Sequence, residues 1–318
     1  MSWRDSVSLE TIRAAAGRID GYVRRTPMLA AGPAKHPLAF DGQLSLKLEC
    51  LQIVGSFKAR GASSKLTSLE PAQVRRGLVT ASGGNHGLGV AYAGWCAEVP
   101  ARVYLPSGTP EEKAKKIAGW GADVVYHGQV WDEANLQALA AAEAEGLTYV
   151  HAFSDPMVIA GQGTVGLEIV EQAPDADVLL VAIGGGGLIS GVAVAAKALK
   201  PELRIIGVEA TGAPTLHASL AAGRLVELER IETEVGTLAP RQSEQINLDI
   251  ISELVEEIVL VDDDDMRRAA RWLWSEFAVA TELSGAATVA ALEIGAYRPP
   301  AGAHVVALVC GGGSDGFA

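Results

Sequence analysis

The sequence predicts an α/β fold in which mostly parallel sheets are flanked by helices. Short apolar runs rich in β-branched residues recur along the chain, and Ala- and Leu-rich segments with helical spacing lie between them. Strands that are apolar almost throughout are typical of parallel sheets covered on both faces. At 318 residues and 49% hydrophobic content, the chain can form two domains, or one large one, around a sizeable core.

The elements are predicted from local pattern, in chain order. A helix opens at Ser8-Leu9-Glu10-Thr11, and Ile12, Ala15 or Ala16, Ile19 and Val23 then share one face. Strands are predicted at 44–48, 78–81, 101–105, 123–126, 149–152, 178–183, 204–208, 257–261 and 304–309, and the clearest helices at 131–144, 188–199 and 266–280. The acidic run 262–265 precedes the last of these, where we expect it to cap the helix rather than bind a cation.

Charge and cysteine usage exclude several classes of protein. The formal net charge is −12, and no cluster of Lys and Arg stands out, so we expect no nucleic-acid partner. The first residues lack the apolar core of a signal peptide. Cys50, Cys96 and Cys310 show neither metal-site spacing nor a paired framework, which indicates a reducing cytoplasm.

The uncharged segment 178–196 is nominally long enough to cross a membrane. Four consecutive glycines divide it, with β-branched residues before them and a periodic Ala-rich stretch after them. We therefore expect a strand, a loop and a helix there, and no membrane span.

Lys58 is the strongest candidate for a reactive residue. It lies in Gly55-Ser56-Phe57-Lys58-Ala59-Arg60-Gly61, and two glycine-rich segments follow, at 82–87 and 184–191. A lysine combined with a phosphate cradle suits an aldehyde cofactor held as a Schiff base. Gly184 to Gly187 precede a predicted helix, whose backbone N–H groups and dipole attract a phosphate.

A dinucleotide-binding unit is the competing interpretation of the second glycine segment. Glu209 ends the next strand, at the distance where an acid would bind a ribose hydroxyl. The G-x-G-x-x-G spacing fails, however, because Gly185 and Gly187 would require a glycine at Ser190. We therefore favour the phosphate of a smaller cofactor.

Together the three segments resemble the fold-type II family of pyridoxal 5′-phosphate (PLP) enzymes, specifically its serine/threonine dehydratase and serine racemase group. The resemblance runs from Arg25-Thr26-Pro27 to Cys310-Gly311-Gly312, which is nearly the whole chain. It implies a two-domain, tryptophan synthase β-like fold. A large cofactor-binding domain would comprise residues 1–77 and 154–318, with a small α/β domain, 78–153, nested in it and the cofactor between them.

The resemblance also implies residue roles. Lys58 would be both the tether and the base that removes the α-proton, and Asn85 would hydrogen-bond the ring hydroxyl of the cofactor. Cys310 would face the pyridine nitrogen, or else be a small buried core residue. The remaining cofactor contacts would be Phe57, Gly184, Gly185, Gly186, Gly187, Leu188 and Glu282, and the substrate carboxylate would be held by Ser82, Gly83, Gly84, Asn85 and His86. We expect no chemical role for the His86 side chain, which could be a satisfied polar residue.

Two departures from the family pattern narrow the expected function. Racemases of this group carry a serine where this chain has Gly83, so a second acid/base is missing. Cation-binding relatives use a Glu, a small residue and an Asp; Glu209 and Ala213 fit, but Thr215 replaces the Asp, which leaves only a weak metal site. The chain also ends just after the Cys310 motif, so we expect no C-terminal regulatory domain.

We therefore expect a PLP-dependent dehydratase that converts an L-β-hydroxy amino acid, such as threonine, serine or a bulkier relative, to a 2-oxo acid and ammonia. The alternatives are an amino-acid racemase, a β-replacement synthase and a cofactor-binding regulatory protein. Phe153 is expected to line the substrate pocket without fixing its size. The expected partners are a small amino-acid substrate and a second copy of the chain in a homodimer, with no nucleic acid and no membrane.

Overall fold

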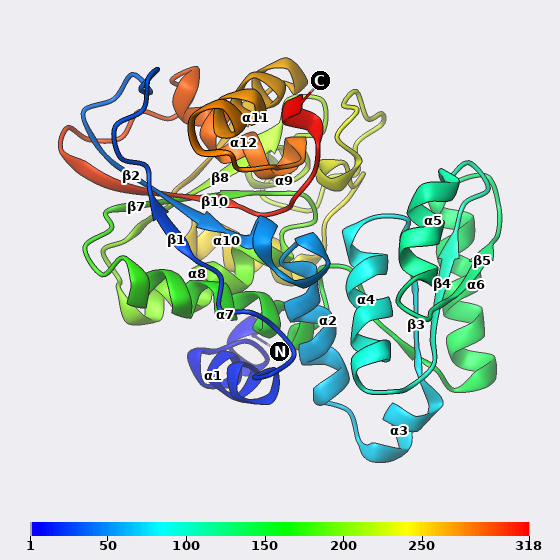
Figure 1. Cartoon of the computed structure of the whole chain (residues 1–318). Helices are drawn as coiled ribbons and strands as arrows, with labels where there is room; N and C mark the ends of the chain where they lie inside the picture. The colour runs from blue at the N-terminus through cyan, green and yellow to red at the C-terminus, as the bar shows by residue number, and fades with distance from the viewer. Residues whose placement is uncertain (1, 318) are drawn as a thin grey trace.

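The structure, a computed structural model, describes residues 2–317 and contains two sheets (Figure 1). The six-stranded sheet has the order β1 (Met28–Ala30), β2 (Gly42–Leu48), β10 (Ala303–Val309), β7 (Val178–Ala182), β8 (Arg204–Ala210) and β9 (Glu257–Val261). The four-stranded sheet has the order β5 (Asp123–Tyr126), β4 (Ala101–Leu105), β3 (Leu78–Ala81) and β6 (Thr148–Tyr149). Every pairing is parallel except β1 with β2, so the predicted fold class is confirmed.

Helices cover both faces of each sheet (Figure 1). Those around the six-stranded sheet are α1 (Leu9–Arg18), α2 (Lys58–Thr67), α7 (Pro156–Gln172), α8 (Gly187–Leu199), α9 (Thr215–Ala222), α10 (Gln245–Leu254), α11 (Asp263–Phe277) and α12 (Leu283–Glu293). Those near the four-stranded sheet are α3 (Pro71–Arg76), α4 (Asn85–Cys96), α5 (Glu111–Ala118) and α6 (Trp131–Glu145). Short 3-10 turns lie at Trp3–Asp5, Glu49–Leu51, Ile53–Gly55, Gly236–Leu238 and Asp315–Phe317.

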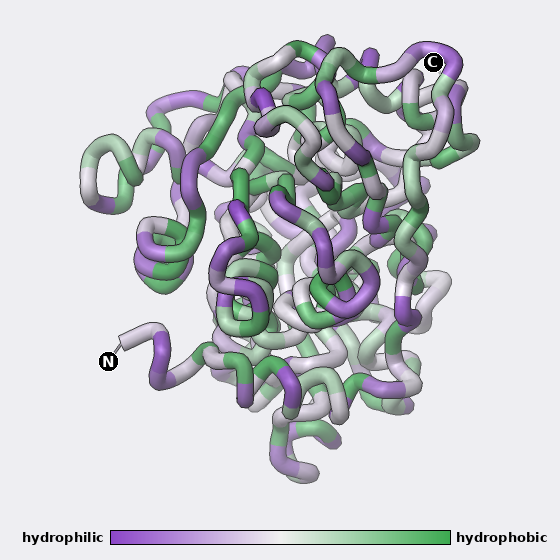
Figure 2. The backbone as a smooth tube through the Cα atoms, turned by 90° about the vertical axis from the view of Figure 1, so that its left-hand side faces the viewer, coloured by the Kyte–Doolittle hydropathy of each residue, from purple (hydrophilic) through white to green (hydrophobic). Residues whose placement is uncertain are grey.

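The central strands form the core of the larger sheet. In β7 every residue is buried, because β10 and β8 flank it and helices cover both faces. The segment 178–196 is thus a strand, a loop and a helix, as the sequence predicts. Figure 2 shows hydrophobic and hydrophilic residues alternating along many of the elements. Within residues 2–317, no helix is both long and apolar enough to cross a membrane.

The helix termini follow the predicted capping. Ser8 caps α1, and its hydroxyl accepts a hydrogen bond from the Thr11 N–H at 3.2 Å. Asp262 caps α11 through the Asp265 N–H, so the acidic run is a capping box. The predicted range 266–280 was wrong at both ends: α11 begins at Asp263 and ends at Phe277, because Ala278 adopts a left-handed conformation with φ of 53°.

Three further sequence predictions are corrected. The face of α1 does not reach Val23, since the helix ends at Arg18. Strand β1 was missed; it is short and only partly buried. The strand predicted at 149–152 ends at Tyr149, because the carbonyls of Val150 and Ala152 accept side-chain donors instead of continuing the ladder.

Helix α2 lies between the two sheets (Figure 1). It packs against α7, which covers the six-stranded sheet, and against α4, which covers the four-stranded sheet. A residue at the start of α2 is therefore close to elements from both parts of the chain.

Candidate active site

Lys58 is the first residue of α2, and its amine points into the interior of the protein. Its Nζ donates a hydrogen bond to the Ala152 carbonyl at 2.7 Å, in the segment that follows β6. Burial lowers the pKa of the Lys58 ammonium from 10.5 to about 8, although Cys310 and Glu282 act in the opposite direction. Near neutral pH a usable fraction of this amine is unprotonated, as a nucleophile or base requires.

The glycine segment between β7 and α8 is packed too tightly for side chains. A Cβ on Gly185 would lie 2.2 Å from Cδ1 of Phe153, and one on Gly187 would lie 2.4 Å from the Phe153 carbonyl oxygen. Gly186 has φ of 91°, which favours glycine, and Gly184 faces the Thr237 carbonyl. Leu188 is buried in the first turn of α8. The first N–H groups of this helix have no intrahelical partner and can bind an anion.

Cys310 lies beside the residues that precede Lys58. The Phe57 N–H donates to the Cys310 carbonyl at 3.3 Å, and Ser56 forms an antiparallel bridge with Gly311. The Cys310 thiol donates to the Ser284 carbonyl at 3.5 Å, and burial raises its pKa. The thiol is therefore neutral and could be a weak hydrogen-bonding partner for a ring nitrogen.

Asn85 and Glu282 are held together across the two parts of the fold. Asn85 Nδ2 donates to Glu282 Oε1 at 2.8 Å, and the Ser284 hydroxyl donates to the same oxygen at 2.5 Å. Burial raises the pKa of Glu282. Asn85 is thus fixed by Glu282, the N-cap residue of α12, which lies close to Cys310. The sequence motifs alone did not indicate this arrangement.

The loop 82–86 joins β3 to the first turn of α4. The Gly84 N–H donates to the Ser82 hydroxyl at 3.3 Å, and α4 begins at Asn85, which leaves N–H groups free to bind a carboxylate. A Cβ on Gly83 would lie 2.8 Å from Cγ2 of Thr109. Thr109 comes from the loop after β4, and no local motif marked it.

The His86 side chain does not face this loop. Its Nε2–H donates to the Val150 carbonyl at 2.9 Å, and burial lowers its pKa to about 3, so the ring is neutral. The family resemblance placed His86 among the substrate-carboxylate contacts, and only its backbone N–H can play that part. The imidazole is a satisfied structural group.

Glu209 caps a helix. Its two carboxylate oxygens accept hydrogen bonds from the Leu216 and His217 N–H groups, both at 2.8 Å, at the start of α9. Thr215 donates its hydroxyl to the Pro240 carbonyl at 2.6 Å. Both Glu209 oxygens are therefore already bound to backbone N–H groups. The sequence had suggested this carboxylate as a weak metal ligand beside Ala213, or as a ribose ligand.

A buried ionic network anchors α2. The Arg60 guanidinium donates to both oxygens of Glu49, at 2.8 and 2.7 Å, and to Glu168 of α7 at 2.7 Å. Lys47 donates to the other Glu168 oxygen at 2.5 Å. These two cations and two carboxylates fix the helix that carries Lys58 to β2 and α7.

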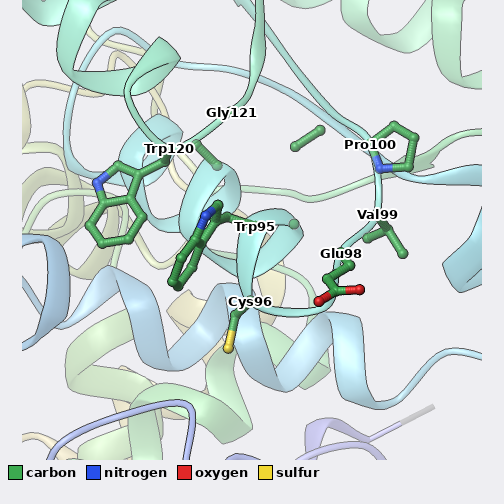
Figure 3. Close-up of a pocket in the computed structure, with 10 residues that line it drawn as sticks. Trp95, Cys96, Glu98, Val99, Pro100, Trp120 and Gly121 are labelled. Carbon is green, nitrogen blue, oxygen red and sulfur yellow. The ribbon is translucent and has the colours of Figure 1, made fainter.

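A separate surface cavity of about 680 Å³ lies at the other end of α4 (Figure 3). Trp95 and Trp120 line it with Glu98, Val99 and Pro100. The 12 residues of α4 separate it from Asn85 by about 18 Å, at the usual helical rise. It is not part of the lysine site.

The residues around Lys58 fit a cofactor that carries an aldehyde and a phosphate. Among residues 2–317, no carboxylate forms an ion pair with this amine, and Ala152 supplies only a neutral carbonyl. The glycine loop 184–187 has no side chains and lies at a helix N-terminus, as a phosphate cradle requires. Fold and site thus fit the class of α/β enzymes that hold a phosphorylated cofactor on a lysine.

The comparisons with known proteins agree with this class. The chain belongs to the pyridoxal-phosphate dependent enzyme family, whose model matches residues 19–311, so its cofactor is pyridoxal phosphate. An L-threonine ammonia-lyase of Thermotoga maritima is 39% identical over 90% of this chain and 71% of its own length. A catabolic L-threonine dehydratase of Escherichia coli is 36% identical over 90% of this chain and 86% of its own length.

Solved structures show the same fold. Maize serine racemase superposes with a TM-score of 0.90 at 32% identity, covering 96% of this chain and 94% of its own. Threonine deaminase isoform 2 of Solanum lycopersicum superposes with a TM-score of 0.87 at 32% identity, covering 95% and 90%. Because both a racemase and a deaminase share the fold, the reaction has to be argued from the site.

Proposed function

We propose that this protein is a PLP-dependent ammonia-lyase that converts an L-β-hydroxy amino acid, with L-threonine as the leading candidate, to a 2-oxo acid and ammonia. The placement of the Lys58 amine carries the proposal: its pKa is lowered to about 8, and it lies near Cys310 and Glu282. The relatives named as L-threonine ammonia-lyases and dehydratases support the substrate class.

The chain's residues divide the work of binding and proton transfer. When bound, PLP supplies an electron sink for the α-carbon of the substrate. N–H groups at 82–86 would hold the substrate carboxylate, those at 184–188 the cofactor phosphate, and Asn85 the ring hydroxyl. Lys58 would take the α-proton, and the β-hydroxyl would leave as water with a proton from the cofactor phosphate. The released enamine would tautomerise and hydrolyse to the 2-oxo acid and ammonia.

Elimination is favoured over racemisation because residue 83 offers no side chain to protonate the α-carbon from the opposite face. Thr109 packs against Gly83, with its Oγ1 3.4 Å from the position of an added Cβ. A neutral thiol at Cys310 is also consistent with elimination, since it would leave the ring nitrogen largely unprotonated.

The deciding experiment measures 2-oxo acid release from L-threonine, L-serine and bulkier β-hydroxy amino acids, with Lys58→Ala as the matched inactive variant. We expect rapid release from at least one substrate, ammonia release far ahead of D-isomer formation, and loss of turnover and visible cofactor absorbance in Lys58→Ala. Formation of D-serine faster than pyruvate, or substantial elimination by Lys58→Ala without added amine, would contradict the proposal.

We further propose the domain limits 1–77 with 154–318, and 78–153, because the four-stranded sheet and its hydrophobic clusters come almost entirely from 78–150. A cytoplasmic location is supported by Cys50, Cys96 and Cys310, none of which forms a disulfide. The proposed homodimer rests on the family resemblance. Limited proteolysis tests the domain limits, and sedimentation tests the dimer.

A further inference from the structure

The Gly185 carbonyl in the glycine loop accepts hydrogen bonds from two side chains that no motif identified. The Ser243 hydroxyl donates to it at 2.9 Å and Asn247 Nδ2 at 2.8 Å. Ser243 is 2% exposed and Asn247 is fully buried. Asn247 lies in the first turn of α10 and Ser243 just before that helix, about 60 residues after the loop, so the contact is purely tertiary.

These two bonds determine which way the loop peptide faces. In a trans peptide the carbonyl and the next N–H point in opposite directions. Because the Gly185 carbonyl faces α10, the Gly186 N–H must point away from α10. Within residues 2–317 that N–H has no hydrogen-bond partner, which leaves it available to a phosphate oxygen.

The Asn247 amide makes a second link, to the segment that holds the lysine. Its Nδ2 also donates to the Phe153 carbonyl at 3.2 Å, and the preceding residue, Ala152, accepts the Lys58 amine. The two carbonyl acceptors fix the orientation of the amide, since an oxygen in the place of Nδ2 would face both of them. One side chain therefore connects the phosphate loop with the lysine acceptor.

We propose that Asn247, assisted by Ser243, is a positioning residue for the cofactor phosphate: it orients the Gly185–Gly186 peptide so that its N–H can bind the phosphate. Asn247 itself does not touch the reacting atoms. Loss of its Nδ2 donors would remove the bond to the Phe153 carbonyl and leave the Gly185 carbonyl with the Ser243 hydroxyl alone, so the peptide would be held less firmly. The predicted consequence is a selective loss of affinity for the phosphate group.

Affinity for PLP relative to pyridoxal isolates this role. Both aldehydes can link to Lys58, so the ratio of their dissociation constants, from fluorescence titration of the apo-protein, reports the phosphate alone. We expect Asn247→Ala to reduce the preference for PLP about 10-fold, equivalent to about 1.4 kcal/mol. Asn247→Thr, which keeps one donor, should fall in between, and Ser243→Ala should give a reduction of about threefold.

Asn135→Ala is the matched control, because the Asn135 side chain accepts a hydrogen bond from Tyr149 near the four-stranded sheet. It should leave the ratio unchanged. If Asn247→Ala does not fold, Ser243→Ala still decides the question. A parallel loss of affinity for both compounds, or a ratio within about twofold of wild type, would overturn the proposal. Because no turnover is measured, the outcome is independent of whether the enzyme is an ammonia-lyase.

Discussion

Replacing Arg60 with methionine tests whether the buried network holds the lysine helix. Arg60 follows Lys58 by two positions in α2, and its side chain is 1% exposed. Besides Glu49 and Glu168, it donates to the Thr164 hydroxyl at 3.1 Å and to the Arg24 carbonyl at 3.2 Å. Methionine has a comparable length but offers no donor, so each acceptor would lose its bond from Arg60. Glu168 would keep Lys47, but Glu49 would keep only the neutral Thr26 hydroxyl.

The expected loss of stability in Arg60→Met follows from the burial of Glu49. Its side chain is fully buried, and the other cation of the network, Lys47, is bound to Glu168 rather than to Glu49. Breaking a buried ion pair and leaving one charge behind costs about 3–5 kcal/mol. The double replacement Glu49→Gln with Arg60→Met removes both charges, so we expect it to recover about 2 kcal/mol or more of that loss.

The assay is urea unfolding of the apo-protein for wild type, both single variants and the double variant, with the slopes compared before the free energies of unfolding. The visible absorbance of the cofactor-loaded variants shows whether Lys58 is still in place. A loss below about 1 kcal/mol in Arg60→Met, or effects that simply add in the double variant, would refute the reasoning.

Three further predictions concern the site. Gly83→Ser would bring its Cβ within 2.8 Å of Thr109 Cγ2, so we expect 2-oxo acid release to slow in this variant. The double variant Gly83→Ser/Thr109→Ala should recover the rate. An unimpaired single variant would contradict this. Cys310→Ser should keep activity within about tenfold (roughly 1.4 kcal/mol). Cys310→Asp should alter the cofactor spectrum and the product ratio, and if both stay unchanged, Cys310 does not face the ring nitrogen. Burial raises the pKa of Glu209 from 4.5 to about 7. The ionised carboxyl therefore destabilises the folded state by its full amount above pH 7, and this destabilisation is absent below pH 4.5. Wild type should therefore gain stability relative to Glu209→Gln, by up to about 3 kcal/mol, as the pH falls from about 8 to 5 in urea unfolding; parallel curves would contradict the raised pKa.

The sequence by itself determined the features that depend on neighbouring residues. Strands such as Leu78–Ala81 and Glu257–Val261 agree with the predicted limits, because apolar β-branched runs bounded by breakers specify a buried strand locally. The Asp262 cap and the glycine loop before α8 are likewise local, since capping and close backbone approach depend on residue type at fixed offsets. The glycine motifs and Lys58 were enough to indicate the class of cofactor.

Only the tertiary structure decided which groups meet. The Lys58 amine contacts Ala152, 94 positions along the chain, and Asn85 contacts Glu282, 197 positions away. Neither these contacts nor the link from Asn247 to Gly185 has a signature at fixed spacing, because each forms only when separate elements pack together. The same packing turned the His86 ring toward Val150 and ended β6 early. Backbone and side-chain donors pair with whichever acceptors the assembled fold brings near, so local pattern identified the chemistry, and packing determined the geometry.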